Sequence, residues 1–349
     1  VSGMTMNDFH SDLYVVAGDN FYQEYLGGST VKIPVGISAV TSKIPGQLKL
    51  KYQVYGWNEL GENIESASGE MEVTAEPFAF KPLNPVECVL PNQNAVMLLA
   101  TTLEDGNGKV LQYNFVPFKV SGQNNTENIV VTKSPSDFTE ADWNIKHLTV
   151  QNGNKVWGMG SGFFEYEFEL PKDLVASDVK GIEFRAELAA RYPQEKYLEE
   201  GDAERIGMTV VSEKGTIPGY GKNSYPQTDE NLHGSLVTIT ANNQVVSEVE
   251  LSDDPADHQG ILSWMNQVPG SERGSNIRKP WLLDEAGSYG YLVVTELDEL
   301  SVQTALETGK VVIRLHVDES TSDRGGISVY GKESGKYPMD LTIIVIPKN

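Results

Sequence analysis

This chain of 349 residues has almost no cysteine, no long apolar run and no surplus of basic residues. Its one cysteine, Cys88, cannot pair within the chain, so no internal disulfide framework holds the fold. We expect Cys88 to be a buried small apolar residue. No apolar run reaches the ~18 residues that a membrane-spanning helix needs, so we expect no membrane insertion.

The formal net charge of −22 argues against nucleic acid and anionic lipid as partners. Before residue 122 the chain has seven lysines, thirteen carboxylates and no arginine, whereas all seven arginines lie after it. Arginine donates planar, bidentate hydrogen bonds, so we expect specific polar recognition in the second part. Most of these arginines should nevertheless pair with the 36 carboxylates around them.

The spacing of strand patterns predicts an all-β protein of two domains. Runs of alternating apolar and polar residues recur about every ten residues in positions 1–121, as in an immunoglobulin-like or fibronectin-like sandwich. A short polar linker from Ser121 to Asn128 follows. The runs in the first domain are Leu13–Val16, Ser29–Val40, Gln47–Trp57, Gly69–Thr74, Val86–Leu90, Ala95–Leu103 and Lys109–Val120.

The strand pattern of residues 128–349 predicts a larger jelly-roll sandwich with long loops. One helix is expected at Asp298–Glu307, because acidic residues stabilise a helix N-terminus. The predicted strands are Lys155–Trp157, Phe163–Leu170, Gly181–Leu188, Ile206–Val211, Ser235–Ala241, Gln244–Glu250, Gly290–Thr295, Lys310–Val317, Gly326–Tyr330 and Leu341–Ile346.

Three glycines at spacing two, Gly158, Gly160 and Gly162, precede the strand Phe163–Leu170. Glycines in this pattern indicate a bulge, a tight bend or the close approach of another group. We expect a bend at a sandwich corner, with a ligand-facing Trp157 as the alternative.

The loop from Ser252 to Gly287 has the densest mixture of acidic and aromatic residues in the chain, and loops of this length often carry function. Its acids and histidine lack the ligand spacing of calcium or zinc sites, so we expect no metal and no cofactor. One interpretation is a sugar site. The other is an Asp-rich turn in which Asp257 bonds local backbone and His258 packs beneath Trp264.

Several segments resemble the C-terminal accessory region of Bacteroidetes-type family 2 glycoside hydrolases, the β-galactosidase-like group. These segments are VWGMGSGFFEYEFELP (156–171), NSYPQTD (223–229), HGSLVTITANNQVVSEVELSDDPADHQGILSW (233–264), GSYGYLV (287–293) and GGISVYGKESGKYP (325–338). The first domain resembles the immunoglobulin-like sandwich that follows the catalytic barrel in such enzymes. The resemblance implies that residues 128–349 are a jelly-roll domain like a carbohydrate-binding module.

The resemblance implies a non-catalytic part of a secreted or periplasmic enzyme that degrades poly- or oligosaccharides. The family's catalytic glutamates belong to a (β/α)₈ barrel, which needs roughly 250 residues of alternating strand and helix, and this chain has no such pattern. No catalytic residue is therefore carried over. The implied partners are the catalytic domains of the same enzyme and a carbohydrate, for instance a galactose-containing oligosaccharide.

Two alternatives remain. A free-standing jelly-roll lyase would use Arg185, His147 or His258 with a tyrosine, but the acidic charge of the second domain weighs against an acidic substrate. A surface adhesion or scaffold protein would more often have repeated modules, and the chain has no internal repeat.

A sugar site in the second domain would need an exposed aromatic ring to stack on a pyranose, with polar groups that bond the hydroxyls. We predict that it lies in the long loops. The predicted binding residues are Trp264, Asp254, Asp257, His258, Trp281, Tyr289 and Arg324.

Overall fold

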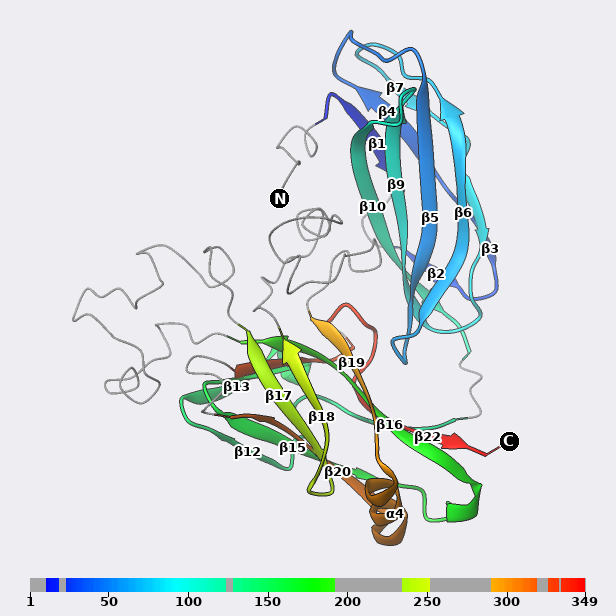
Figure 1. The fold of residues 1–349 in the computed structure, drawn as a ribbon. Helices are drawn as coiled ribbons and strands as arrows, with labels where there is room; N and C mark the ends of the chain where they lie inside the picture. The colour runs from blue at the N-terminus through cyan, green and yellow to red at the C-terminus, as the bar shows by residue number, and fades with distance from the viewer. Residues whose placement is uncertain are drawn as a thin grey trace, which may run out of the picture. The chain divides into compact units, whose positions relative to one another are not determined.

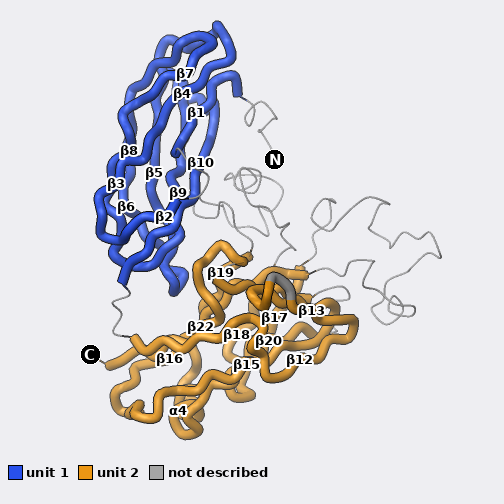
Figure 2. Tube along the Cα trace, turned by 180° about the vertical axis from the view of Figure 1, so that it is seen from behind, with its two compact units in different colours: residues 1–125, 259–288 blue, residues 126–258, 289–349 orange. Residues whose placement is uncertain are grey.

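The computed structural model describes residues 11–18, 23–123, 128–191, 234–251, 290–318, 326–332 and 334–348. These residues form two compact units, one up to residue 123 and one from residue 128 onward (Figure 2). Each is a β-sandwich (Figure 1), which confirms the all-β prediction. Within the described ranges, no helix is long and apolar enough to cross a membrane.

The first sandwich places a five-stranded sheet of order β2-β10-β9-β5-β6 against the smaller sheets β1-β4-β7 and β3-β8. Its core lies between these sheets and includes Leu50, Val54, Leu99 and Cys88, so the prediction that Cys88 is buried is confirmed. The strands are β1 Leu13–Ala17, β2 Glu24–Leu26, β3 Thr30–Ile33, β4 Val35–Ala39, β5 Leu48–Asn58, β6 Asn63–Val73, β7 Phe80–Pro82, β8 Val86–Val89, β9 Ala95–Asp105 and β10 Val110–Ser121.

One strand prediction in the first sandwich is wrong. The run Ser29–Val40 forms two strands, β3 and β4, which meet at Pro34 and belong to different sheets. Proline has no backbone N–H to donate to a β-ladder, so the ladder is interrupted there and the chain changes sheets.

The second sandwich consists of a seven-stranded and a five-stranded sheet. The first has the order β11-β22-β16-β21-β14-β13 with β19 on the other edge of β16, and the second has the order β12-β15-β20-β17-β18. Its strands are β11 Ile129–Lys133, β12 Glu140–Trp143, β13 Lys146–Val150, β14 Lys155–Met159, β15 Gly162–Glu169, β16 Val179–Ala190, β17 Ser235–Ala241, β18 Gln244–Leu251, β19 Tyr291–Glu296, β20 Lys310–Val317, β21 Gly326–Tyr330 and β22 Leu341–Pro347.

The local elements of the second sandwich follow from local sequence. Helix α4, Glu299–Thr308, begins after Asp298, whose side chain accepts a hydrogen bond from the Ser301 N–H, and ends at Gly309 in the left-handed conformation. The helix prediction is therefore confirmed. Asn242 and Asn243 both have positive φ angles, as the tight turn between β17 and β18 requires. Two short 3₁₀ helices, Gln151–Gly153 and Ala176–Asp178, complete the described elements.

The alternating pattern of β15 places its rings in the core, where Phe164, Tyr166 and Phe168 are fully buried. The Tyr166 hydroxyl donates to the Pro135 carbonyl at 2.8 Å, which satisfies its polar end inside the sandwich. Burial raises the pKa of this hydroxyl, so it stays protonated.

The three glycines between Trp157 and Phe163 have different roles. Gly160 and Gly162 have positive φ angles, as expected of the bend between β14 and β15. Gly158 lies inside β14, where a Cβ atom would be 2.0 Å from the indole ring of Trp143. The prediction of a bend is therefore confirmed for Gly160 and Gly162, whereas Gly158 leaves space for the Trp143 ring.

Candidate functional site

Strand ends that are far apart in sequence meet at one end of the second sandwich. The Arg191 N–H, just after β16, donates to the Gly326 carbonyl at the start of β21 (2.9 Å). The hydroxyl of Ser235, at the start of β17, donates to that carbonyl at 2.7 Å and accepts from the Gly326 N–H at 3.0 Å. Two further pairs belong to this end: Ser235 pairs with Leu251 at the end of β18, and Val237 pairs with Val317 at the end of β20.

The start of β19 lies beside the same end, because Tyr291 pairs with Leu188 near the end of β16. We call this end of the second sandwich the loop end. The opposite end has helix α4 and the β17–β18 turn (Figure 1). Residues 192–233, 252–289 and 319–325 lie outside the described residues, and each of these segments connects strands that end or begin at the loop end. Sandwich domains commonly use the connections between strands at one end of the sandwich for recognition.

Beside the loop end, charged and aromatic side chains share the outer face of the seven-stranded sheet. Strand alternation directs Val156, Ile327 and Val329 into the core, so their neighbours point outward. We call this group the outer cluster. It consists of Lys155, Trp157, Glu187, Arg191, Tyr330, Lys336 and Tyr337, each at most 7% exposed.

Three cations of the outer cluster lie over aromatic rings. The Arg191 guanidinium is 4.2 Å from the ring centre of Trp157, and the Lys155 ammonium is 4.4 Å from that of Tyr330. The Lys336 ammonium is 4.9 Å from the ring centre of Tyr337. Such contacts partly compensate a cation for the water it loses on burial.

Glu187 is the one carboxylate of the outer cluster and is 1% exposed. Its oxygens accept hydrogen bonds from the Lys336 and Tyr337 N–H groups, both at 3.0 Å. Burial raises the pKa of Glu187 from 4.5 to about 7, although these bonds, the Gly290 N–H and the Lys336 charge act in the opposite direction. The carboxyl group therefore titrates near neutral pH.

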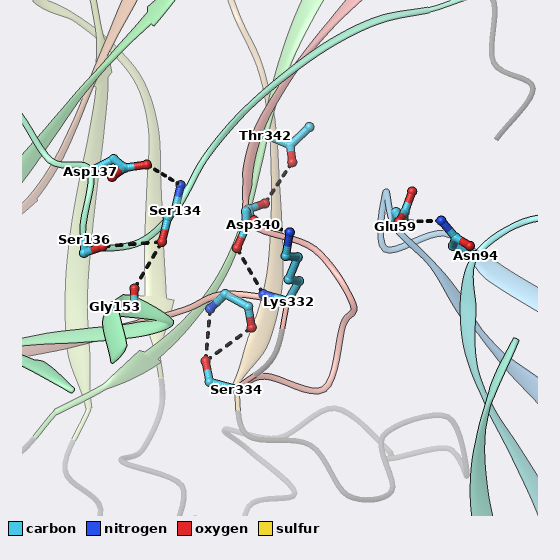
Figure 3. Close-up of polar contacts among 11 residues, drawn as sticks. Glu59, Asn94, Ser134, Ser136, Asp137, Gly153, Lys332, Ser334, Asp340 and Thr342 are labelled. Atoms are coloured by element: carbon cyan, nitrogen blue, oxygen red, sulfur yellow. Dashed lines mark hydrogen bonds and ion pairs between the residues drawn. The ribbon is translucent and has the colours of Figure 1, made fainter. Parts of the chain in front are cut away.

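The connection between β21 and β22 is held by its own polar contacts (Figure 3). The side chain of Asp340 accepts from the Lys332 N–H at 3.1 Å and lies 3.8 Å from the Lys332 ammonium. The Ser334 hydroxyl donates to the Asn154 carbonyl at 2.5 Å and accepts from the Gly331 N–H at 3.1 Å. These bonds place the connection against the segment before β14.

The residues predicted from the sequence as a sugar site lie outside the described residues. They are Asp254, Asp257, His258, Trp264, Trp281, Tyr289 and Arg324, and the predicted strand Ile206–Val211 lies outside them as well. All seven residues belong to segments that connect strands at the loop end.

The structure does not bring Arg185 and His147 together. Arg185 is on the outer face of the seven-stranded sheet, where it donates to Glu183 at 2.8 and 3.1 Å. His147 pairs with Gly158 on the other face, with its ring edge-on to Phe138 and Phe164. Arg185 and His147 therefore could not act together at one sugar, and the alternative of a lyase that uses one of them, or His258, with a tyrosine stays a prediction.

Sequence reasoning noted Trp157 but missed the rest of the outer cluster. The sequence gives little signal, because the charged residues Glu183, Arg185 and Glu187 of β16 alternate with apolar ones as on any solvent-facing side of a strand, and Lys155 is the first residue of β14. Lys336 and Tyr337 could not be assigned to the same place, because they reach the sheet from a connection. Among the residues that the structure describes, no group of three or more His, Cys, Asp or Glu side chains could hold a metal ion.

Comparisons with known proteins do not assign the chain to a family. No family model matches it, and neither does any curated protein. Among solved structures, a red sea bream transglutaminase matches 52% of this chain and 23% of its own length, with 9% identity and a TM-score of 0.21. The sporulation control protein Spo0M of Bacillus subtilis matches 50% of this chain and 77% of its own, with 11% identity and a TM-score of 0.22.

Proposed function

We propose that this chain is a non-catalytic part of a periplasmic or extracellular glycoside hydrolase of family 2, and that its second sandwich binds carbohydrate at the loop end. The main support is the convergence of the ends of β16, β18 and β20 with the starts of β17, β19 and β21. A rigid sandwich that brings several connections to one end can present side chains from distant parts of the sequence to one ligand.

The choice of carbohydrate rests on the sequence resemblance and on the composition of the connecting segments. Sugar recognition needs an aromatic plane together with groups that donate to and accept from hydroxyls. The segment that connects β18 to β19 contains Trp264 and Trp281 with Asp254, Asp257 and His258. The first sandwich is proposed as a spacer that adjoins the catalytic domains of the same enzyme.

The first prediction concerns binding. In calorimetric titrations with galactose-containing oligosaccharides, the full chain should bind at least one member of the panel. Trp264→Ala should weaken that binding at least fivefold without lowering the melting temperature, because a stacked ring contributes about 1–3 kcal/mol to such a site.

The control is Phe80→Ala, whose ring is 56% exposed on the first sandwich and should not affect binding. The assignment would be wrong if the wild-type chain bound no sugar. It would also be wrong if Trp264→Ala lost stability and kept its affinity, because the ring would then be structural.

The second prediction concerns catalysis. The purified chain should release no product from aryl-galactosides or polysaccharides above the uncatalysed rate. Glycosidases need two facing carboxyl groups about 5–10 Å apart, whereas Glu187 is the only carboxyl group of the outer cluster and is committed to backbone N–H groups. Turnover by the wild-type chain that disappears in Glu187→Gln, or on substitution of another acid of this chain, would overturn the proposal.

A further inference from the structure

The outer face of the sheet β1-β4-β7 in the first sandwich is uncharged. Leu13, Val15 and Ile37 belong to the core, so the residues next to them along the strands point outward. The outward residues are Tyr14, Val16, Gly36, Ser38, Phe80 and Pro82. None of them carries a charge at neutral pH, in a chain with a formal net charge of −22. We call this surface the β7 face.

Large apolar side chains on and beside the β7 face are exposed to solvent. The exposed fraction is 56% for Phe80 and 38% for Tyr14. Val40, directly after β4, and Phe78, two residues before Phe80, are 66% and 72% exposed. Since β4 and β7 run antiparallel, Val40 and Phe78 lie at the same end of the face. Exposed apolar residues that gather in one place mark a recognition surface.

The backbone of Phe78 shows that its ring is not required locally. The Ala79 N–H donates to the Glu76 carbonyl at 3.3 Å, which closes a turn with Pro77 and Phe78 as its central residues. Phe78 has a φ angle of 54°, in the left-handed region that glycine or asparagine usually occupies at this position of a turn. A phenylalanine that is both strained and exposed serves neither the turn nor the core. The remaining role for its ring is contact with another molecule.

The ring of Phe80 lies over β4. A Cβ atom at Gly36 would be 2.4 and 2.5 Å from two atoms of this ring, so the ring occupies the space above the glycine. Tyr14 lies opposite Ser38, and Ser38 lies opposite Phe80, so the three residues form one row across the sheet. Two strand spacings, about 9–10 Å, separate the Cα atoms of Tyr14 and Phe80, which is comparable to the length of two linked pyranose units. The half-buried Ser38 between them has a hydroxyl that can donate to and accept from sugar hydroxyls.

The size and charge of the β7 face limit its ligand. Its strands have at most five residues, and three such strands cover roughly 200–250 Å². Each partner in a stable protein–protein interface contributes about 800 Å², so the face is too small for a second copy of this chain. Without a cation, it also offers no partner to the phosphate groups of nucleic acid or lipid. A neutral ligand with apolar ring faces and hydroxyl groups fits both limits.

We propose that the β7 face binds a neutral polysaccharide, with Phe80, Tyr14 and Phe78 stacked on pyranose rings. The Ser38 hydroxyl bonds to the sugar hydroxyls between these rings. This site is separate from the loop end and goes beyond the proposed function, in which the first sandwich has no ligand.

The β7 face and the loop end differ in the form of ligand that they bind. A short soluble oligosaccharide contacts few of the rings on the β7 face and loses its freedom of motion on binding. A particle of polysaccharide presents ordered chains at high local concentration. The face should therefore retain the chain on particles and contribute nothing measurable to titrations of soluble oligosaccharides, in which Phe80→Ala is the control.

The test is sedimentation of the full chain with particles of cellulose, mannan and agarose. At least one of these polysaccharides should retain the wild-type chain. Phe80→Ala should lower the affinity at least fivefold, because it removes the ring that lies over Gly36. Phe78→Gly should also lower the affinity but not the melting temperature, because glycine adopts the left-handed conformation readily.

Two further variants are controls. Leu26→Ala changes an apolar residue that is 73% exposed on β2, in the other large sheet of the first sandwich, and should bind as the wild type does. Trp264→Ala should keep the retention on particles, since it concerns the loop end. Retention that is lost in Trp264→Ala and kept in Phe80→Ala would assign the binding to the loop end and overturn this proposal alone.

Three other results would contradict the proposal. One is that none of the three polysaccharides retains the wild-type chain. Another is that Phe78→Gly keeps the wild-type affinity, whatever Phe80→Ala does, because the loss in Phe80→Ala would then reflect stability. The third is a dimer in analytical ultracentrifugation that Phe80→Ala dissociates, since a second copy would then cover the face.

Discussion

Replacing Gly158 by alanine should destabilise the second sandwich by roughly 3 kcal/mol or prevent its folding. The added Cβ would lie 2.0 Å from the Trp143 ring, which is 7% exposed in the core. The indole cannot yield easily, because it packs against the buried ring of Phe164 with 5.1 Å between ring centres. Backbone strain does not contribute, because Gly158 has no positive φ angle.

The matched control is Gly181→Ala on β16 of the same unit, where no atom lies within 4 Å of the added Cβ. Its free energy of unfolding should change by about 0.5 kcal/mol or less. Denaturant titrations of both variants, followed by tryptophan fluorescence, would measure the difference. Equal stabilities would mean that the Trp143 ring has room to move, which contradicts the packing described above.

Phe164→Ala should also have a large effect, about 3–5 kcal/mol of lost stability. The side chain of Phe164 is fully buried on β15, between Trp143 and Phe138, with ring centres 5.1 and 5.3 Å away. Truncation would leave a cavity between the two sheets, and a packed core collapses only in part around such a gap.

The adjacent Phe163 gives a sharp comparison, because it has the same side chain on the opposite face of the same strand. It is half-buried, with the Arg314 guanidinium 4.0 Å from its ring centre. Phe163→Ala should cost about 1 kcal/mol, since the lost contact is with a charged group near solvent. Thermal unfolding of both variants would compare the stability that each one loses. A larger loss for Phe163→Ala than for Phe164→Ala would contradict the assignment of Phe164 to the core and of Phe163 to the opposite face of β15.

Local patterns were enough to predict most of the strands and the helix. The alternation of rings and carboxylates in β15 depends only on the period of two in an extended chain, so it correctly indicated which side chains enter the core. The same holds for the hairpin at Asn242 and Asn243. Short strands such as β2 and β7 were missed, because three residues carry too little pattern to separate them from loop.

The candidate site could be predicted only in part. The acidic and aromatic residues of the segment that contains Trp264 predicted a sugar site there. This site stays a prediction, because the segment lies outside the described residues. The outer cluster could not be predicted from the sequence, because Glu187 and Lys336 are 149 residues apart and meet only through the pairing of β16 with β21. No local periodicity encodes such a pairing.

The sequence by itself determined the all-β class, the alternation of buried and exposed faces, and the turns whose φ angles only glycine or asparagine adopt readily. These properties follow from interactions between residues that are close in the chain. The tertiary structure decided which strands become neighbours, and therefore which charged residues are buried. It turned Gly158 into a space for an indole ring and Glu187 into an acceptor for distant amides, because burial and hydrogen bonding depend on what lies across the sheet.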